Sequence, residues 1–395
     1  MNEQKINELL ETSRNVIKDA ALPNGAIVAA NTDEKYYPHT AKDYRYVWPR
    51  DAAYICIAAD YLDDANQREC EHESTRKLDN AKLCEKIKPF PIPHLKGEGI
   101  PMDIQEPYFK WLEERPEDFK KEGLLYQNYS TNGKKFGGQF QPDQMGVTLF
   151  AIWRHFKNNI SSASKYEILI KRLADGICGE WKGAYFFKNT SDLWEEGKRM
   201  TSTKMENNFT YTLAACASGL EKAGLIFPNN GNWKKVATEM RGKIDDAYNE
   251  KEKYFFRNHG KIDDKNIDAS MLGLVWPFFV IDANDKRIKN TVKKMEEKLA
   301  LDGGVRRFEM DYYDGEGTAQ EGAGAWPLLN FWMSIYCAKA GDKKKAEKYF
   351  DWVIERLGNN YIPEQIFGDF REGKGVTPLV WSHAMFVISF YEIYN

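Results

Sequence analysis

Helical segments of two kinds alternate along this chain, and the alternation restricts its fold more than any other feature of the sequence. Apolar residues spaced three and four apart, with helix breakers between the runs, predict about twelve helices. One kind is amphipathic and rich in Lys and Glu, and the other carries few charges. The charged helices lie near 232–249, 285–298 and 343–358, and the apolar ones near 206–223, 268–280, 324–340 and 378–393. The remaining helices are predicted near 4–20, 51–64, 104–114, 143–157 and 164–176.

A closed ring is the fold that this order favours. A charged helix keeps one face in water, whereas a helix that is apolar all round is buried. Alternation in about six pairs therefore predicts an all-α (α/α)6 toroid, with six inner helices inside six outer ones. Strand patterns are short, at 182–188 and 254–257, and predict small β-hairpins in loops. An irregular helical array or a solenoid stays open, since no sequence repeat distinguishes these folds.

Composition and charge narrow the possible partners. No stretch rich in Pro, Gly and Ser divides the chain, so residues 1–395 are predicted to form a single domain. With 42% hydrophobic and 14% aromatic residues, the chain can bury a large core. The 56 Lys and Arg are balanced by 59 Asp and Glu, so neither nucleic acid nor an anionic membrane is expected as a partner. The six His show no metal-binding spacing and no phosphate-binding glycine loop occurs, which predicts neither metal nor cofactor.

The chain as written is expected to be cytoplasmic, as a monomer or a weak homo-oligomer. Its first twenty residues are polar and lack a signal-peptide core, and its most apolar run, 271–281, is too short to span a membrane. Residues 66–103 are charged, then rich in Pro and Gly, and predict an excursion over one end of the ring. The cysteines form no CxxC pair and are expected as buried, reduced thiols, although pairing of Cys70 with Cys84 is left open.

The segments that precede the apolar helices share a composition, with an aromatic residue close to Arg, Asp or Glu. If the inner helices run parallel, their N-termini meet at one end of the ring, and these segments line one mouth. Pyranose rings offer apolar C–H faces to aromatic side chains and hydroxyls to planar charged groups, so such a mouth suits a sugar. The segments are 44–51, 139–143, 192–196, 306–313 and 363–365.

Each segment also has a simpler interpretation. Pro49, Arg50 and Asp51 suit the first turn of a helix, and Asp143 suits a helix cap. Two adjacent glutamates, as at 195–196, usually form a solvated pair. Here Leu193 and Trp194 precede them and are expected to draw the carboxylates inward, where burial near a like charge raises a carboxyl pKa.

At these residues the chain resembles glycoside hydrolase family 15, the glucoamylase and glucodextranase group. The resemblance extends from residue 44 to residue 383, and it implies an (α/α)6 catalytic barrel that inverts the anomeric centre. The residues that carry it are Tyr46-Val47-Trp48-Pro49-Arg50-Asp51-Ala52, Asp192-Leu193-Trp194-Glu195-Glu196, Arg307-Phe308 with Asp311 and Tyr313, Pro363-Glu364-Gln365, and the stretch from Thr377 to His383.

The resemblance implies a role for each site residue. Glu195 is the expected general acid and Glu364 the expected general base, with Tyr44 supporting the base and its water. The non-reducing glucose is expected to be held through its hydroxyls, with help from two backbone carbonyls, in a pocket lined by two tryptophans. The hydroxyl-binding residues are Arg50, Asp51, Glu196 and Arg307, the carbonyls are those of Leu193 and Trp194, and the lining tryptophans are Trp48 and Trp381.

The implied activity is that of an inverting, exo-acting α-glucosidase that releases β-D-glucose from the non-reducing end. Relatives commonly carry a β-sandwich or a starch-binding module, and neither pattern occurs in this sequence, which predicts short glucosides with α-1,6 bonds, as in isomaltose, or α-1,4 bonds. The segments 66–103 and 309–325 are expected to decide the linkage. A trehalase-type α,α-1,1 hydrolase, a non-catalytic sugar-binding toroid and an (α/α)6 enzyme for uronic or β-linked sugars are the alternatives.

Overall fold

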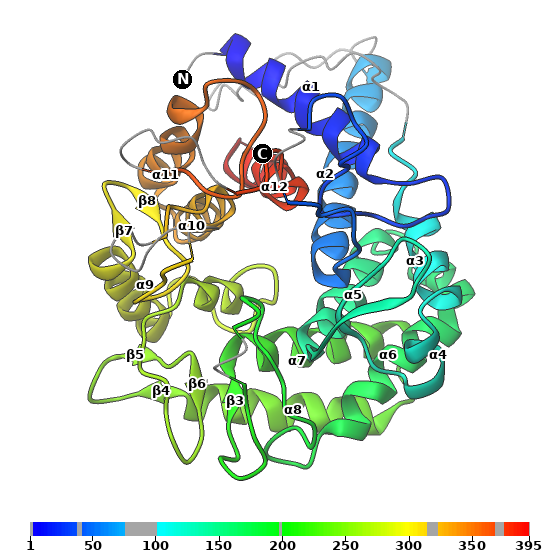
Figure 1. Cartoon of the computed structure of the whole chain (residues 1–395), viewed down its shortest axis with the longest axis vertical. Coiled ribbons are helices and arrows are strands. Elements are labelled where there is room, and N and C mark those ends of the chain that lie inside the picture. Colours follow the sequence, from blue (N-terminus) through cyan, green and yellow to red (C-terminus); the bar gives the residue numbers. More distant parts are fainter. Residues whose placement is uncertain are drawn as a thin grey trace.

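The helices form a ring of two layers (Figure 1). The computed structural model of the chain describes residues 3–37, 42–75, 101–196, 200–313, 323–367 and 375–394. Within these ranges, the inner layer consists of five α-helices and one 3-10 helix, taken in chain order. They are α2 (Pro49–Thr75), α5 (Pro142–His155), α7 (Thr210–Ile226), η3 (Ala269–Leu274), α10 (Pro327–Lys339) and α12 (Val380–Tyr394).

The inner layer closes on itself. Each inner element packs against the next one in chain order, and α12, the last, packs against α2, the first. The outer helices alternate with them along the chain and cover their outward faces. They are α1 (Glu3–Ala20), α3 (Gln105–Glu114), α6 (Glu167–Glu180), α8 (Gly231–Asp246), α9 (Lys286–Lys298) and α11 (Lys343–Arg356). The predicted (α/α)6 toroid is therefore confirmed.

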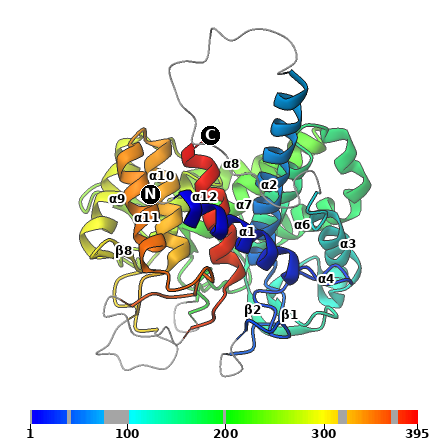
Figure 2. The same ribbon diagram turned by 90° about the horizontal axis from the view of Figure 1, so that it is seen from above.

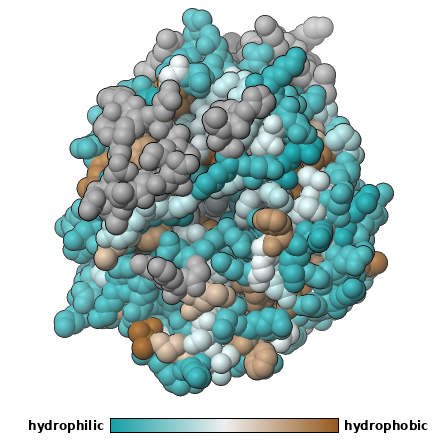
Figure 3. All heavy atoms as spheres, viewed as in Figure 1, coloured by the Kyte–Doolittle hydropathy of each residue, from teal (hydrophilic) through white to brown (hydrophobic). Residues whose placement is uncertain are grey.

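Burial separates the two layers as the charge pattern predicted. In α10, every residue from Pro327 to Cys337 is buried, so this helix can lie only in the interior. In α9, Ile288, Thr291, Val292 and Met295 are the buried residues, spaced to form one apolar stripe against the ring. The face of the molecule shown in Figure 3 is largely hydrophilic, with small and separate apolar patches.

One predicted inner helix is not an α-helix. Residues 268–280 form the six-residue η3, followed by turns, instead of a continuous helix. Pro277 accounts for the early end, because proline has no N–H to donate and disfavours the helical conformation of the residue before it. The structure also contains short elements that the sequence pattern did not predict. Among them are α4 (Glu117–Glu122), the 3-10 helix η1 (Ile160–Tyr166), and the strands β1 (Tyr126–Tyr129) and β2 (Lys135–Phe140).

The strands form two-stranded antiparallel pairs in the loops. β1 pairs with β2, and the segment predicted at 254–257 supplies β5 (Tyr254–Phe255), which pairs with β4 (Tyr248–Asn249). The segment predicted at 182–188 makes one bridge, from Trp181 to Phe186. The other pairs are β3 (Asn208–Phe209) with β6 (Asn258–His259) and β7 (Ala300–Leu301) with β8 (Gly304–Val305).

Helix α2 leads away from the end of the ring where β1 and β2 lie (Figure 2). Its 27 residues span about 40 Å at 1.5 Å per residue.

Residues 76–100, most of the predicted excursion, lie outside the described residues, as does the predicted wall at 314–322. Cys84 and the side chain of Cys70 are likewise outside them, while the thiols of Cys56, Cys178, Cys216 and Cys337 form no disulfide. In the described part of the chain, no helix has the length and apolar character needed to cross a membrane.

Candidate active site

A cavity of about 310 Å³ brings together all eleven site residues expected from the sequence. They come from segments that precede or begin the inner helices, and they lie together on this cavity. Of the five segments expected to line one mouth, 139–143 supplies no lining residue. The volume lies at the lower end of the range found for small-molecule sites. The eleven are Tyr44, Trp48, Arg50, Asp51, Leu193, Trp194, Glu195, Glu196, Arg307, Glu364 and Trp381.

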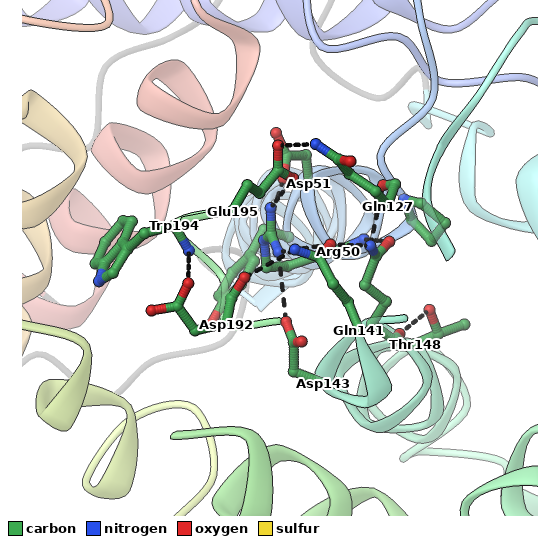
Figure 4. A network of polar contacts seen from close by, with 12 residues as sticks. Arg50, Asp51, Gln127, Gln141, Asp143, Thr148, Asp192, Trp194 and Glu195 are labelled. Carbon is green, nitrogen blue, oxygen red and sulfur yellow. Dashed lines mark hydrogen bonds and ion pairs between the residues drawn. The ribbon is translucent and has the colours of Figure 1, made fainter. Parts of the chain in front are cut away.

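Arg50 lies at the centre of a buried network (Figure 4). It occupies the first turn of α2, is 3% exposed, and forms ion pairs of 3.4 Å with each of Asp51, Asp143 and Glu195. Its guanidinium carbon lies 5.4 Å from the centre of the Trp381 ring. Burial raises the pKa of Asp51 to about 7, against the opposing effect of Arg50. The planar cation therefore pairs with three carboxyl groups, of which those of Asp51 and Glu195 line the cavity.

Asp143 contributes to this network and does not cap its helix. Gln141 stands at the N-cap position of α5, and Asp143 lies inside the first turn, where its carboxylate accepts a hydrogen bond from Arg50. The side-chain amide of Gln141 donates to the backbone carbonyl of Asp192 at 2.8 Å. The segment 139–143 thus supports both Arg50 and the loop that carries Glu195.

The loop 192–196 is fixed by buried ion pairs beneath it. The Asp192 carboxylate accepts hydrogen bonds from the Trp194 backbone N–H at 3.2 Å and from Arg257 Nε at 2.9 Å. Trp194 Nε1 donates to both carboxylate oxygens of Asp268 at 3.1 Å, and Arg257 also pairs with Asp268. These contacts hold Glu195 at a φ of 63°, a left-handed conformation that strains residues other than glycine.

The Glu195 carboxyl group has a donor on each oxygen. Gln127 Nε2 donates to Oε2 at 2.6 Å, and Arg50 Nη2 donates to Oε1 at 3.4 Å. Burial raises the pKa of Glu195, although the hydrogen bonds from Arg50 and Gln127 oppose the shift. Burial is thus the main cause, and the neighbouring like charge expected from the sequence is not among the main causes of the shift. A raised pKa is the property that a general acid needs.

Glu364 lies on the same cavity and is 4% exposed. Tyr44 Oη donates to its Oε1 at 3.3 Å, while its Oε2 is buried without a hydrogen-bond partner in the described structure. Burial raises the pKa of Glu364, and the nearby Arg307 and Tyr44 act in the opposite direction. Tyr44 Oη also lies 3.4 Å from Tyr313 Oη. One oxygen of the carboxylate is therefore hydrogen-bonded to Tyr44, and the other is buried without a hydrogen bond from the described residues.

Arg307 is held in one orientation by Asp311 and by aromatic rings. Its Nε and Nη2 donate to the two carboxylate oxygens of Asp311 at 2.7 and 2.8 Å. Its guanidinium carbon lies 4.7 Å from the centre of the Trp326 ring and 5.0 Å from that of Tyr313. A guanidinium fixed in this way presents its remaining N–H groups in a defined direction.

Indole donors in the cavity wall have no partner in the described structure. They are the buried Nε1 atoms of Trp326 and Trp381. A buried polar group without a hydrogen bond is costly, so these two indole N–H groups carry an energetic penalty in the folded chain. No group of three His, Cys, Asp or Glu side chains is placed to hold a metal ion in the described ranges.

Five lining residues had no role predicted from the sequence, namely Ala29, Gln127, Tyr313, Trp326 and Leu379. Trp326 and Pro327 begin α10 in the same way that Trp48 and Pro49 begin α2, and this repeated dipeptide was a usable signal. Tyr313 belongs to the motif with Arg307 and Asp311, but the sequence predicted no role for its side chain. Gln127 had no such signal, because it lies on a short strand and reaches Glu195 across the tertiary structure.

Comparison with known proteins identifies one family. The family model described as glycosyl hydrolases family 15 matches residues 112–359. An uncharacterized glycosyl hydrolase of Methanocaldococcus jannaschii is 28% identical over 93% of this chain and 53% of its own length. Trehalase 2 of Sulfolobus acidocaldarius is 25% identical over 94% of this chain and 60% of its own length. Isomaltose glucohydrolase of Kribbella flavida is 24% identical over 70% of this chain and 71% of its own length. The chain thus spans little more than half the length of the first two relatives.

Solved structures share the fold. A wild-type glycosidase aligns with a TM-score of 0.72 and 20% identity, over 99% of this chain and 97% of its own. A bacterial glucoamylase complexed with acarbose aligns with a TM-score of 0.69 and 20% identity, over 98% of this chain and 55% of its own. At this identity the likeness extends to the fold, and the chemistry has to be argued from the cavity.

Proposed function

The chain belongs to glycosyl hydrolases family 15, and on that basis we propose that it is an inverting, exo-acting α-glucosidase that releases β-D-glucose from the non-reducing end of short α-glucosides. One observation carries the proposal: Glu195 and Glu364, which precede the different inner helices α7 and α12, lie on one cavity beside a fixed Arg307 and a buried Arg50. This is the pair of carboxyl groups that glycoside hydrolysis requires.

The two carboxyl groups divide the chemistry. Glu195, with its raised pKa, donates a proton to the oxygen of the leaving sugar. Glu364 accepts a proton from a water molecule that attacks the anomeric carbon from the opposite face, and Tyr44 orients the carboxylate through its hydroxyl. Attack from that face inverts the configuration, so an α-linked glucose leaves as the β-anomer. Inverting enzymes leave room for this water by holding the two groups about 6.5–9.5 Å apart.

The cavity wall binds the terminal glucose. Arg50, Asp51 and Arg307 provide buried charged groups for hydroxyls, and Glu196 is the remaining hydroxyl ligand of the proposal. Trp48 and Trp381 provide apolar faces, and the loop at Leu193 and Trp194 provides backbone carbonyls. A cavity of about 310 Å³ suits one sugar unit at a chain end, which supports exo action.

The linkage separates two candidates. Isomaltose glucohydrolase among the relatives supports α-1,6 bonds, and α-1,4 bonds are the related possibility. The trehalases of Sulfolobus acidocaldarius and Thermoplasma acidophilum support an α,α-1,1 hydrolase as the second candidate. A non-catalytic sugar-binding toroid is less well supported, because both catalytic carboxyl groups are present on the cavity.

NMR of fresh reaction products tests the proposal. The protein is mixed with isomaltose, maltose or trehalose, and the anomeric signals are followed before mutarotation. Initial β-glucose from isomaltose or maltose is expected. Initial α-glucose would remove the inverting assignment, and cleavage of trehalose alone would select the second candidate. A thermal shift with glucose and no hydrolysis of any disaccharide would favour the binding protein.

A further inference from the structure

One buried glutamine joins the two segments that hold the general acid. Gln127 and Arg50 donate to the two oxygens of Glu195, at 2.6 and 3.4 Å (Figure 4). They come from distant parts of the chain, since Gln127 lies on β1 and Arg50 lies in the first turn of α2. Gln144, in the first turn of α5, contacts both of these segments. Its side chain is therefore placed to set the distance between the two donors.

The amide of Gln144 binds each segment through its backbone. Its Oε1 accepts the Arg50 backbone N–H at 3.3 Å. Its Nε2 donates to the Gln127 carbonyl at 3.0 Å and lies 3.3 Å from the Tyr126 carbonyl. Nε2 also contacts Gln141 Oε1, which accepts from the Arg50 guanidinium at 3.5 Å. Because both ends of one planar amide are engaged, the strand and the start of α2 cannot move apart without breaking these hydrogen bonds.

Gln127 lies where the pairing of its strand is irregular. The register between β1 and β2 shifts between Tyr126 and Asn128, so Gln127 stands at the shift. Such an irregularity re-aims a side chain, and here the amide is directed at the general acid. A Cβ at Gly137 of β2 would come within 2.5 Å of Gln127 Oε1, so β2 limits movement on one side. The hydrogen bond from Gln144 fixes the backbone of the same residue.

Gln144 itself has no contact with the cavity. Its side chain is 0% exposed, and it is not among the lining residues in the described part of the chain. Any effect of Gln144 on the reaction therefore passes through Gln127 and Arg50. A glutamine that served stability alone would make the same hydrogen bonds, so the test has to measure the chemistry of the acid as well as folding.

We propose that Gln144 is a positioning residue for the general acid, because it holds the Gln127 strand at a fixed distance from Arg50 and so places the carboxyl group of Glu195 against the glycosidic oxygen. The inference rests on the proposed function, in which the Glu195 proton moves to the leaving oxygen as the C–O bond breaks. Water forms the new bond to the anomeric carbon and gives its proton to Glu364. Gln144 takes no part in these bond changes.

The test compares two substrates in Gln144→Met, which nearly keeps the size of the side chain and removes its amide. A disaccharide releases an alcohol and needs the proton, whereas α-D-glucosyl fluoride releases fluoride and needs little protonation. The quantity measured is kcat/KM for the disaccharide that wild type cleaves fastest, divided by kcat/KM for the fluoride. Gln144→Met is expected to lower this ratio about 10- to 100-fold, since a displacement of about 1 Å can cost about 100-fold. An unchanged ratio overturns the positioning role.

Gln105→Met is the matched control. Gln105 is also a buried glutamine, at 1% exposed, and its amide donates to Asp60 at 2.9 Å and to Asp63 at 3.2 Å. At 1.5 Å per residue, Asp60 lies about 15 Å along α2 from Arg50. The wild-type ratio is therefore expected in this control, although buried hydrogen bonds are lost here too. An equal fall of the ratio in both variants contradicts the inference.

Gln144→Asn is measured in parallel, because the loss of buried hydrogen bonds can prevent Gln144→Met from folding. Asparagine keeps a buried amide but is shorter by one methylene, so it cannot contact Gln127 and Arg50 together. A lowered ratio is expected in this variant as well. If Gln144→Asn folds and retains the wild-type ratio, the positioning role is lost.

Titration of Glu195 separates this inference from the proposed function. The hydrogen bonds from Arg50 and Gln127 oppose the burial that raises the pKa of Glu195, so weakening them raises this pKa further. NMR of protein labelled with isotopic glutamate follows the carboxyl signal, which Glu195→Gln assigns.

The two failures are distinguishable. If wild type cleaves no glucoside, but Glu195 titrates at higher pH in Gln144→Met than in wild type and Gln105→Met, hydrolysis fails and the placement of Glu195 stands. If wild type cleaves glucosides, and neither the ratio nor the titration changes in Gln144→Met, the positioning role fails and hydrolysis stands.

Discussion

Arg50 is the residue on which the contacts of the cavity converge. Three carboxyl groups lie within 3.4 Å of its guanidinium, in surroundings where it is 3% exposed. Removing a buried cation leaves its partners charged and unpaired, which costs several times more than breaking an exposed ion pair. Replacing Arg50 is therefore expected to disturb the structure of the cavity, and substitutions of single carboxyl groups test the proposed mechanism more cleanly.

Glu364→Gln keeps the shape of the base and removes its ability to accept a proton. A general base contributes about 10²- to 10⁴-fold, so kcat is expected to fall by that factor while glucose binding persists. Steady-state kinetics and calorimetry measure the two effects. Glu355→Gln on α11, whose side chain is 73% exposed, is the control. Near wild-type turnover in Glu364→Gln would remove this residue from the role.

Gln127→Leu removes the amide that donates to Glu195 Oε2. That hydrogen bond favours the ionised carboxylate and lowers its pKa, so its loss raises the Glu195 pKa further above the usual glutamate range. The proton donor then stays protonated to higher pH, and the basic limb of the kcat/KM profile is expected to shift upward. An unchanged basic limb would show that this contact does not tune the acid.

At the scale of elements, α5 and α7 approach each other through glycines. A Cβ at Gly219 of α7 would lie 2.6 Å from the Gly146 carbonyl oxygen of α5, which is a backbone atom and cannot easily move. In an exposed helix, replacing Gly with Ala stabilises by about 1 kcal/mol. At Gly219 the close approach of the two helices makes the same replacement destabilising.

Gly219→Ala is expected to lower the free energy of unfolding by about 1–3 kcal/mol, the cost of overpacking. Gly224→Ala, in the same helix, is the control, because a Cβ there meets no atom within 4 Å. This control is expected to raise stability by up to about 1 kcal/mol. Urea unfolding measures both variants, and equal effects would contradict the close approach.

Helix α12 fixes the loop that carries Glu364. His383 Nε2 accepts the Ile362 backbone N–H at 2.9 Å, so its Nδ1 carries the proton and donates to Ser13 Oγ at 2.8 Å. Ser382 Oγ donates to the Pro363 carbonyl at 3.1 Å. A neutral imidazole thus joins α1, α12 and the base loop.

Burial lowers the pKa of His383 to about 3, from the model-peptide value of 6.5. A histidine with a lowered pKa contributes stability above pH 6.5 and loses it as pH falls toward 3. The loss is at most about 5 kcal/mol, and it is expected to disappear in His383→Asn. Denaturant unfolding of wild type and His383→Asn between pH 7 and pH 4 measures how steeply the free energy of unfolding of each falls with pH.

His155→Asn is the control for this pH dependence, because its shift has the opposite sign. Burial lowers the pKa of His155, but Asp60 and Glu106 outweigh burial and raise it. The stability that His155 contributes is present at low pH and lost as pH rises through its raised pKa. His155→Asn is therefore expected to retain the acid-side loss caused by His383.

At the scale of the whole molecule, the ring is closed by contact of α12 with α2. Cavity residues from Tyr44 to Trp381 depend on that closure, because they come from both ends of the chain. We propose that residues 1–395 form a single domain that unfolds in one step, because closure of the ring joins elements from both ends of the chain. Far-UV circular dichroism and tryptophan fluorescence are expected to give one coincident thermal transition. Two separate transitions would contradict the single domain.

Much of the fold and of the cavity could be predicted, for a local reason. Most helix positions follow from apolar spacing within a few residues, and the layer of each helix follows from its own charge. Helix α2 is an exception, because it continues past the predicted end at residue 64 to Thr75, into the segment expected to be an excursion. The exceptions are also instructive. Pro277 ends η3 earlier than the apolar pattern predicted. No sequence pattern indicated that Gln127 on β1 would contact Glu195.

By itself, the sequence determined the helices, their alternation, and the residue types that gather at one end of the ring. The tertiary structure decided which atoms meet there: Gln127 with Glu195, Tyr44 with Glu364, and Phe136 with Tyr46. Periodicity is a property of neighbours along the chain. These contacts, and the burial that raises the pKa of both carboxyl groups, exist only after residues far apart in sequence are brought together by closure of the ring.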